Sequence, residues 1–265
     1  ARPTVSVVGA GLERAERTTR DLLAALRRAT VPAIGFVNER KLQPSGAVDP
    51  RRVALLQQWI DAGFDLGNHT YSHPDLHRID VEAFAADIVK GQQVTRGLLA
   101  ASGKQPRYFR HPFLHTGRSR EVRDRVDAEL TRLGYTVAPV TIDNYDYTFA
   151  AAWDRASAAN DIALAGRIEA AYLEYMSDVV EYYEQQSLAI LGRPMAHTLL
   201  LHANALNALT IERLVAGLRA RGYRFVTLDE ALKDPAYASK DEYFGPAGIT
   251  WLHRWAITQG RRGIF

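Results

Sequence analysis

The 265-residue sequence contains no cysteine, which excludes disulfide scaffolds, thiolate metal sites and cysteine nucleophiles. It has no apolar run near the ~20 residues that cross a bilayer, and no basic-then-apolar leader opens it. The formal net charge is only +3, and the basic residues form no aromatic-interleaved stripe of the nucleic-acid-binding type. We therefore expect a soluble protein with no membrane span and no nucleic-acid partner.

The remaining composition is that of an ordinary globular protein. Hydrophobic residues make up 47% of the chain, which is enough for a substantial core. Because no repeat or linker interrupts the sequence, we expect one domain over residues 1–265, with its core at 4–232 and an extension at 233–265. The opening residues are compatible with a removed export signal, so the prediction is a periplasmic or secreted protein. A cytoplasmic location stays open, as does the oligomeric state.

Short β-rich stretches alternate with longer stretches whose apolar residues recur at helical spacing. Such alternation is typical of α/β folds with a parallel sheet, and about seven strand–helix units fit the chain length. We therefore predict a (β/α) barrel of about seven parallel strands. Residues 148–192 follow the fifth predicted strand and are helical in pattern, which predicts an inserted pair of helices. The predicted strands are 4–8, 33–37, 64–68, 107–111, 136–140, 197–202 and 223–227.

Polar side chains follow four consecutive predicted strands, while the strand interiors are apolar. In parallel α/β folds the loops after the strands face one cleft, so these residues are expected to meet there. One buried histidine is usually a satisfied core residue, and we interpret His197 in this way. Four polar endings in the same relative place indicate a site. They are Asn68, His69 and His73, then Arg110, then Asp143 and Asp146, and finally His202 and Asn204.

His69 and His73 are four residues apart. On a helical turn this spacing places both imidazoles on one face, as a divalent metal site requires. A surface turn would explain the pair equally well by itself, but its position at the end of an apolar strand favours a metal site. His77 continues the spacing, but Pro74 breaks the turn, and we interpret His77 as structural or exposed.

Four motifs in these places, in order along the chain, resemble those of the polysaccharide deacetylase family, the NodB-homology domains of carbohydrate esterase family four. They are "HTYSH" (69–73), "FRHPF" (109–113), "DNYDY" (143–147) and "LLLHAN" (199–204). Tyr147 stands where the family motif has tryptophan. The resemblance extends from about residue 4 to about residue 232. It implies a distorted (β/α) barrel.

The resemblance also implies a metal-dependent hydrolase that removes acetyl groups, mainly N-acetyl, from an acetylated polysaccharide or oligosaccharide. His69 and His73 would hold a divalent ion, most often Zn²⁺. His202 would be the general acid that protonates the departing amine. Asp143 is the first candidate to orient His202, and Asp146 is the alternative. Asp146 could instead be an ordinary turn residue.

Other residues of the matching motifs would bind the substrate. Arg110 would hold a carboxylate in the cleft through its planar fork, unless it forms a structural ion pair with Asp143. The backbone N–H of Phe113 would help to bind the tetrahedral oxyanion. Tyr147 and Asn204 are expected to line the substrate site.

The family's first motif, Thr-Phe-Asp-Asp, has no counterpart here. It supplies the general base and the third metal ligand, but the corresponding place reads "VSVVGAGLER" and the first aspartate in the chain is Asp21. A catalytic zinc site usually has three protein ligands. We expect that a short segment carrying the aspartates is missing from this sequence between Val7 and Gly9. The alternative is a glycan-binding protein on the same scaffold that has lost catalysis.

Overall fold

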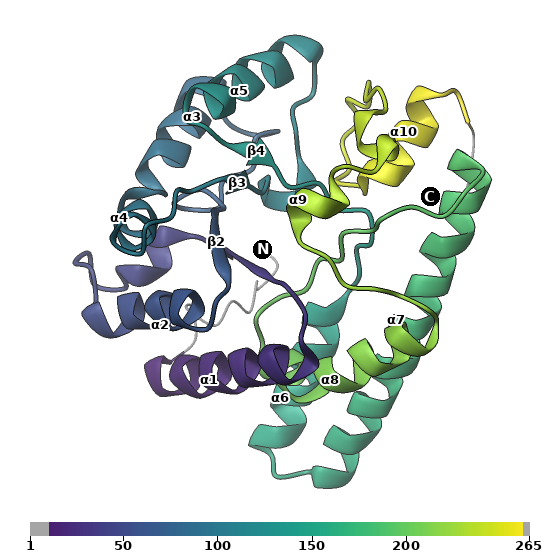
Figure 1. Ribbon diagram of the computed structural model, residues 1–265. Coiled ribbons are helices and arrows are strands. Elements are labelled where there is room, and N and C mark those ends of the chain that lie inside the picture. The colour runs from purple at the N-terminus through teal and green to yellow at the C-terminus, as the bar shows by residue number, and fades with distance from the viewer. Residues whose placement is uncertain (1–10, 262–265) are drawn as a thin grey trace. The chain divides into compact units, whose positions relative to one another are not determined.

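The computed structural model describes residues 11–261, which divide into two compact units (Figure 1). The sheet unit contains Ile34–Thr141 and the described residues from Asp234 onward. The helical unit contains the described residues up to Ala33 together with Ile142–Lys233. The predicted strand 4–8 and the aspartates expected between Val7 and Gly9 lie outside the described residues.

The sheet unit is built on a four-stranded sheet in the order β1-β2-β3-β4. All pairings are parallel, and Asn68 at the end of β2 is in register with both Val37 and Phe109. Parallel strands need crossover connections, and helices provide them here. The protein therefore has an α/β fold with parallel strands. The strands are β1 (Ile34–Val37), β2 (Asp65–Asn68), β3 (Tyr108–Phe109) and β4 (Thr136–Val137), and the helices are α2 (Pro50–Asp61), α3 (Val81–Lys90), α4 (Gln93–Ala101) and α5 (Arg120–Arg132).

Side-chain caps determine where these helices begin. Asp49 accepts a hydrogen bond from the Arg51 N–H, with Pro50 at the first helical position of α2, as its pattern predicts. Asp80 caps α3 and Ser119 caps α5 in the same way. Each cap satisfies a backbone donor that the helix itself leaves without a partner.

The core of the sheet unit lies between the sheet and its helices. Phe84 of α3 and Phe109 of β3 are fully buried, and their rings meet edge to face with centroids 6.3 Å apart. Burying one such side chain contributes about 1.5–3 kcal/mol. The cluster comprises Leu76, Val81, Phe84, Ile88, Phe109, Val126, Leu130 and Tyr135.

The C-terminal segment belongs to the sheet unit. It contains the short helices η4 (Pro235–Ala238) and α10 (Trp251–Thr258), and the Trp251 N–H donates to the Val140 carbonyl at 2.8 Å. Trp255 is buried, at 1% exposure. The extension predicted at 233–265 is thus part of a folded core as far as it is described.

The helical unit consists of α1 (Leu12–Ala29), α6 (Asp146–Ala158), α7 (Ile162–Leu191), α8 (Ala205–Ala220) and α9 (Leu228–Ala231). Helix α1 lies along α8, and α6 packs against both α7 and α8 (Figure 1). Helices α6 and α7 occupy the segment in which a helical pair is predicted. The 30-residue α7 begins at the N-cap Asp161 and ends at Gly192, whose φ of 72° suits glycine.

The predicted count of about seven strands is not confirmed. Among residues 11–261 the structure has four strands and one isolated parallel bridge, Ile142 to Leu199. The predicted strand 197–202 contributes only this bridge, and 223–227 is not a strand. A β-rich sequence favours an extended backbone, but a strand also needs a neighbouring strand that completes its hydrogen bonds. None of the described helices, α7 included, has both the length and the apolar character of a membrane span.

Candidate active site

The loop after β2 is held by Asn68. Its Oδ1 accepts from the Thr70 N–H at 2.7 Å, and its Nδ2 donates to the Ile88 carbonyl at 3.0 Å and the Tyr135 hydroxyl at 3.1 Å. Asn68 is only 2% exposed, so these bonds are shielded from water. Its role is to support the loop that carries His69 and His73.

This loop is not the helical turn that the four-residue spacing suggested. Thr70 and His73 have left-handed φ values of 64° and 61°, and the Thr70 hydroxyl accepts from the His73 N–H at 3.0 Å. Ser72 donates through its N–H and its hydroxyl to the carboxylate of Asp87. A Cβ at Gly91 would lie 2.4 Å from the Thr70 backbone, so only glycine fits beneath the loop. Two left-handed residues, rather than one helical face, bring the imidazoles together.

The His69 and His73 rings are arranged edge to face, with centroids 4.7 Å apart and an interplanar angle of 82°. Nδ1 of His69 lies 2.7 Å from the Arg110 carbonyl oxygen, to which it donates a proton. The lone pair of this imidazole is therefore on Nε2. Metal-binding histidines are typically oriented by such a bond from their second nitrogen. The pair fits two ligand positions of a divalent ion.

A third ligand for this pair is not located in residues 11–261. The one group of three potential histidine or carboxylate ligands found there is Asp75, His77 and His115, which contains neither His69 nor His73. The third ligand that the resemblance implies was expected between Val7 and Gly9, outside the described residues.

Arg110 follows β3 and is 8% exposed. Its Nε donates to the Ala138 carbonyl at 2.8 Å, and its guanidinium carbon lies 4.5 Å from the centroid of the Phe36 ring. The carbonyl of the same residue orients His69. Arg110 thus ties the end of β3 to the end of β4 and to the imidazole pair.

Phe113 has a strained backbone and an exposed side chain. Its φ is 57° and that of Leu114 is 55°, both in the left-handed region that disfavours side chains. The Phe113 ring, in a residue 48% exposed, contacts the His73 ring with centroids 4.6 Å apart. Such strain persists only where neighbours enforce it, and it concentrates at functional sites.

The C-terminal segment enforces this conformation. A Cβ at Gly248 would lie 1.7 Å from the Phe113 carbonyl oxygen, so the two backbones meet directly. Arg254, 1% exposed, donates to the Leu114 carbonyl at 3.3 Å and to the Thr116 hydroxyl. Sequence analysis missed both positioning residues. An arginine inside the mostly apolar "WLHRWAI" was the available signal.

In the helical unit, His202 is paired with Asp146. Nδ1 of His202 lies 2.6 Å from Oδ1 of Asp146, and the His202 N–H donates to Oδ2 at 2.8 Å. The carboxylate that orients His202 is therefore that of Asp146, the first residue of α6, and the assignment of Asp143 to this position is corrected. Two residues that precede α6 separate the two aspartates, and a sequence motif alone does not show which aspartate turns inward.

Asp146 is completely buried, and its carboxylate oxygens accept hydrogen bonds from amide N–H groups. Asn207 Nδ2 donates to Oδ2 at 2.6 Å, and Asn204 Nδ2 approaches the same oxygen at 3.3 Å. Asn204 also caps α8 and is only 2% exposed, so it supports Asp146, and its contact with substrate stays a prediction. Asn207, which sequence analysis missed, in turn accepts from the Tyr172 hydroxyl at 2.6 Å.

Tyr147 keeps the place expected from its motif within the helical unit. Its ring meets the His202 ring edge to face, with centroids 5.7 Å apart. The aromatic neighbour shields one side of the imidazole from water. The two sets of predicted residues thus each assemble: His69, His73, Arg110 and Phe113 in the sheet unit, and Asp146, Tyr147, His202 and Asn204 in the helical unit.

Comparison with known proteins places these motifs in a family. A family model described as polysaccharide deacetylase matches residues 9–138. Residues 9–138 of the chain belong to the polysaccharide deacetylase family. The match contains the imidazole pair and the Arg110–Phe113 loop.

Two fungal chitin deacetylases are similar in sequence to this family member. One, from Arthroderma benhamiae, is 24% identical over 181 residues, a match that covers 68% of this chain and 40% of that protein. The other, from Colletotrichum lindemuthianum, is 24% identical over 221 residues, which is 82% of this chain and 75% of that protein. The chain thus spans less than half of the first relative's length.

Solved structures of the family share the fold. The Colletotrichum lindemuthianum chitin deacetylase superposes with a TM-score of 0.56 at 22% identity, over 82% of each chain. A family 4 carbohydrate esterase pseudoenzyme from Bacillus anthracis gives a TM-score of 0.52 at 16% identity, over 82% of this chain and 61% of the other. Proteins named as an enzyme and as a pseudoenzyme therefore resemble this chain to nearly the same degree.

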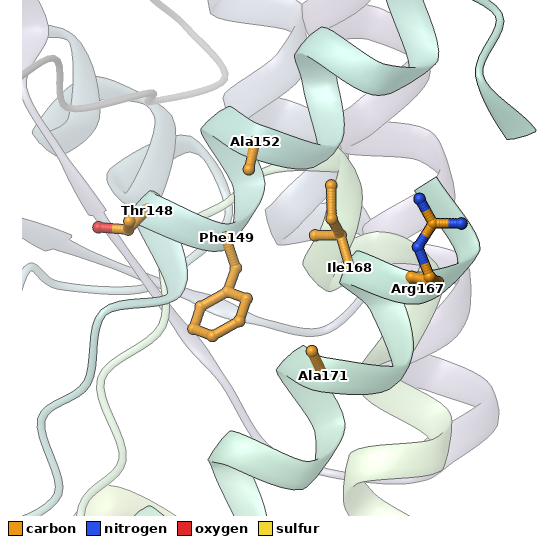
Figure 2. A pocket seen from close by; sticks show the side chains of 6 residues that line it. All are labelled: Thr148, Phe149, Ala152, Arg167, Ile168 and Ala171. Carbon is orange, nitrogen blue, oxygen red and sulfur yellow. The ribbon is translucent and has the colours of Figure 1, made fainter. Parts of the chain in front are cut away.

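The helical pair that follows Asp146 encloses an apolar groove of about 380 Å³ between α6 and α7 (Figure 2). Phe149 projects into it opposite Ile168, and Arg167 lies at its edge. The Phe149 ring also stacks on Tyr175 with centroids 5.0 Å apart. The groove therefore begins about one helical turn from the Asp146–His202 pair.

Proposed function

We propose that this protein is a metal-dependent hydrolase that removes acetyl groups, mainly N-acetyl, from a polysaccharide or oligosaccharide. The reaction breaks the C–N bond of a linear amide and releases acetate. The observation that carries the proposal is the edge-to-face His69–His73 pair, with the His69 tautomer set by the Arg110 carbonyl. Family membership supports the same chemistry.

His69 and His73 would hold the divalent ion, most suitably Zn²⁺, because two neutral imidazoles are borderline-soft donors. When bound, the ion supplies polarisation of the acetyl carbonyl and acidification of a water molecule. The protein's own contribution is to present Nε2 of His69 and a His73 whose ring contacts the Phe113 ring and whose backbone N–H donates to the Thr70 hydroxyl.

His202 is proposed as the general acid. Its Nδ1 bond to Asp146 leaves Nε2 to carry the proton that the departing amine receives. The buried carboxylate stabilises the imidazolium electrostatically, as expected for an orienting aspartate. Asn207 and the His202 N–H hold that carboxylate in place without neutralising it.

Phe113 and Arg110 are proposed to act on the substrate side. The strained Phe113 backbone directs its N–H for the oxyanion of the tetrahedral intermediate, where a single donor is worth ~10²–10³ in kcat. Arg110 is proposed to interact with a carboxylate at the site through guanidinium nitrogens other than Nε. Tyr147, beside His202, is proposed to contact the sugar.

Acetate release from chito-oligosaccharides, with Zn²⁺ present or removed by a chelator, tests the proposal. We expect turnover that the chelator abolishes and that the H69A and H202N variants lose. H197Q is the matched control, because it removes an imidazole from outside the proposed machinery and should leave turnover unchanged. Turnover that survives both the chelator and H69A would overturn the proposal.

A second candidate is a non-catalytic glycan-binding protein. It is favoured by one observation: no third ligand joins His69 and His73 among residues 11–261. Retention on acetylated glycan together with the absence of acetate release at saturating Zn²⁺ would support it. Intact-mass spectrometry is decisive for the third ligand, because a mass above that of the printed sequence would reveal the expected aspartate segment.

The proposed partner is an acetylated glycan, and the proposed location is periplasmic or secreted, where structural polysaccharides are found. Fractionation of producing cells tests the location, and recovery only from the cytoplasm would contradict it.

A further inference from the structure

Asp75, His77 and His115 form a second cluster of ligand-type side chains in the sheet unit. One ligand atom from each lies within 4.8 Å of the others, and no other such trio occurs in residues 11–261. Oδ1 of Asp75 accepts from Nδ1 of His115 at 2.6 Å and from the His77 N–H at 2.9 Å. None of the three belongs to the machinery proposed for deacetylation.

His77 is the unexplained member of the cluster. Both of its ring nitrogens are buried, and neither forms a hydrogen bond of normal geometry with a described residue, although the Pro246 backbone lies near enough to act on the ring. Buried polar atoms nearly always have a partner, because losing hydration without replacement is costly. The ring of His77 therefore keeps a nitrogen available for a partner that the polypeptide does not supply.

The ring arrangement shows how that partner could bind. The His77 and His115 rings are stacked, with centroids 3.8 Å apart and planes 7° from parallel. A metal ion lies in the plane of each imidazole that binds it, so two stacked rings cannot share one ion without a rotation. Asp75 holds His115 in place, whereas no hydrogen bond to the ring holds His77. His77 is therefore the ring that can turn.

We propose that Asp75, His77 and His115 bind a divalent transition-metal ion, separate from the ion at His69 and His73. Two imidazoles and one carboxylate are a donor set that suits Zn²⁺. The nearby cations do not oppose this strongly: Arg78, 3.3 Å from Asp75 Oδ2, is 84% exposed in its side chain, and Arg118 is exposed. Solvent screens such charges.

The ion would connect two loops of the sheet unit. Asp75 and His77 follow the loop of the imidazole pair, whereas His115 follows Phe113, whose ring contacts both His73 and His115. Cross-linking these segments would steady Phe113. The site is structural, and it does not depend on the proposed deacetylase activity.

Metal stoichiometry of the full chain tests the proposal. The H69A/H73A double variant removes the first pair, and we expect it still to bind one equivalent of Zn²⁺ or Co²⁺, with a rise in melting temperature. Adding H77N to this background should abolish that binding, whereas adding H197Q, the matched control, should leave it intact. A double variant that binds no Co²⁺, or a triple variant that still binds one equivalent, would overturn the proposal.

Crystals of the unaltered chain soaked in Zn²⁺ provide a readout that does not require H77N to fold. Anomalous scattering should show a peak among Asp75, His77 and His115, with the His77 ring turned out of the stack. The absence of this peak would overturn the proposal. Acetate release is measured separately, so failure of the deacetylase proposal would not be confused with failure of this one.

Discussion

Each unit of the protein contains an aspartate–histidine pair, and the two pairs have the same Nδ1–Oδ1 separation of 2.6 Å. Their surroundings differ. Asp146 is completely buried and pairs with no arginine or lysine among residues 11–261, whereas Asp75 is partly exposed and is also paired with Arg78. When no other cation is paired with a carboxylate, its negative charge interacts mainly with the imidazole. The comparison teaches that the neighbours of the aspartate, rather than the distance, separate the pair proposed for acid–base chemistry from the pair proposed for metal binding.

The histidines differ in the same sense. His202 lies in a chain of bonds that runs through Asp146 and Asn207 to Tyr172, so its orientation is determined at every step. For Asp75, burial is the largest single influence and would raise the carboxyl pKa, but the hydrogen bonds from His115 and the His77 N–H, together with the charges of these two histidines, outweigh it and the pKa is lowered. That second pair ends at the unpartnered ring of His77.

Of the variants that test this comparison, D146N should give the largest change in kcat. The substitution removes the charge that supports the His202 imidazolium and disrupts the Asn207 bond, so we expect kcat to fall by ~10²–10⁴. Acetate release against pH measures it. D75N, the matched change in the other pair, should leave kcat within about tenfold; equal losses in both variants would mean that the surroundings do not distinguish the pairs.

G248A should give the next largest effect, through the sheet unit. The added methyl group would lie 1.7 Å from the Phe113 carbonyl oxygen and must displace that loop. Misplacing a reactive group by about 1 Å can cost ~10²-fold in rate. We expect kcat to fall with little change in Zn²⁺ content, measured by steady-state kinetics and elemental analysis.

G217A is the control for that variant. Nothing lies within 4 Å of a Cβ at this helix position in α8, so the free energy of unfolding should rise by about 0.4–1 kcal/mol with kcat unchanged. Comparable kcat losses in the two glycine variants would contradict the role of Gly248.

Acidification should lower the free energy of unfolding through two buried histidines of the sheet unit, His111 and His253. Burial, then the charges of Arg254 and Arg123, lowers the pKa of His111 to about 3. Burial lowers the pKa of His253 to about 4. Both rings gain a proton on unfolding at any pH between the folded value and the unfolded value near 6.5. The contribution of these two neutral rings to the free energy of unfolding is therefore fully present above about pH 6.5. It is lost as the pH falls towards about 4 and below.

Thermal unfolding followed from about pH 7 to about pH 4 measures this loss. H253Q should reduce the pH dependence, because it removes one of the groups that bind a proton on unfolding. An unfolding temperature that is constant across this range would contradict the prediction.

Y172F should give the smallest effect. It removes the hydroxyl that donates to Asn207 at 2.6 Å but keeps the ring, so unfolding should become easier by about 0.5–1.5 kcal/mol with only a small fall in kcat. Chemical denaturation measures it. Y145F is the matched control, since Tyr145 is 59% exposed, and a larger loss there would contradict the network.

Much of the site could be predicted because it depends on local sequence. The polar residues that follow β2 and β3, the Asp49–Pro50 helix start and the helical pair at 148–192 are all properties of short segments. The errors concern contacts between segments. Asp143 was preferred to Asp146, and the roles of Gly248 and Arg254 were missed.

The sequence by itself determined the parallel α/β class, the family and the residue types of the site, because periodicity, capping and motif spacing act over a few residues. Only the tertiary structure decided that Asp146 holds His202, that Gly248 and Arg254 shape the Phe113 loop, and that His115 stacks on His77. These contacts join residues 38 to 140 positions apart. Which distant groups meet depends on how whole elements pack, and no short segment of sequence contains that information.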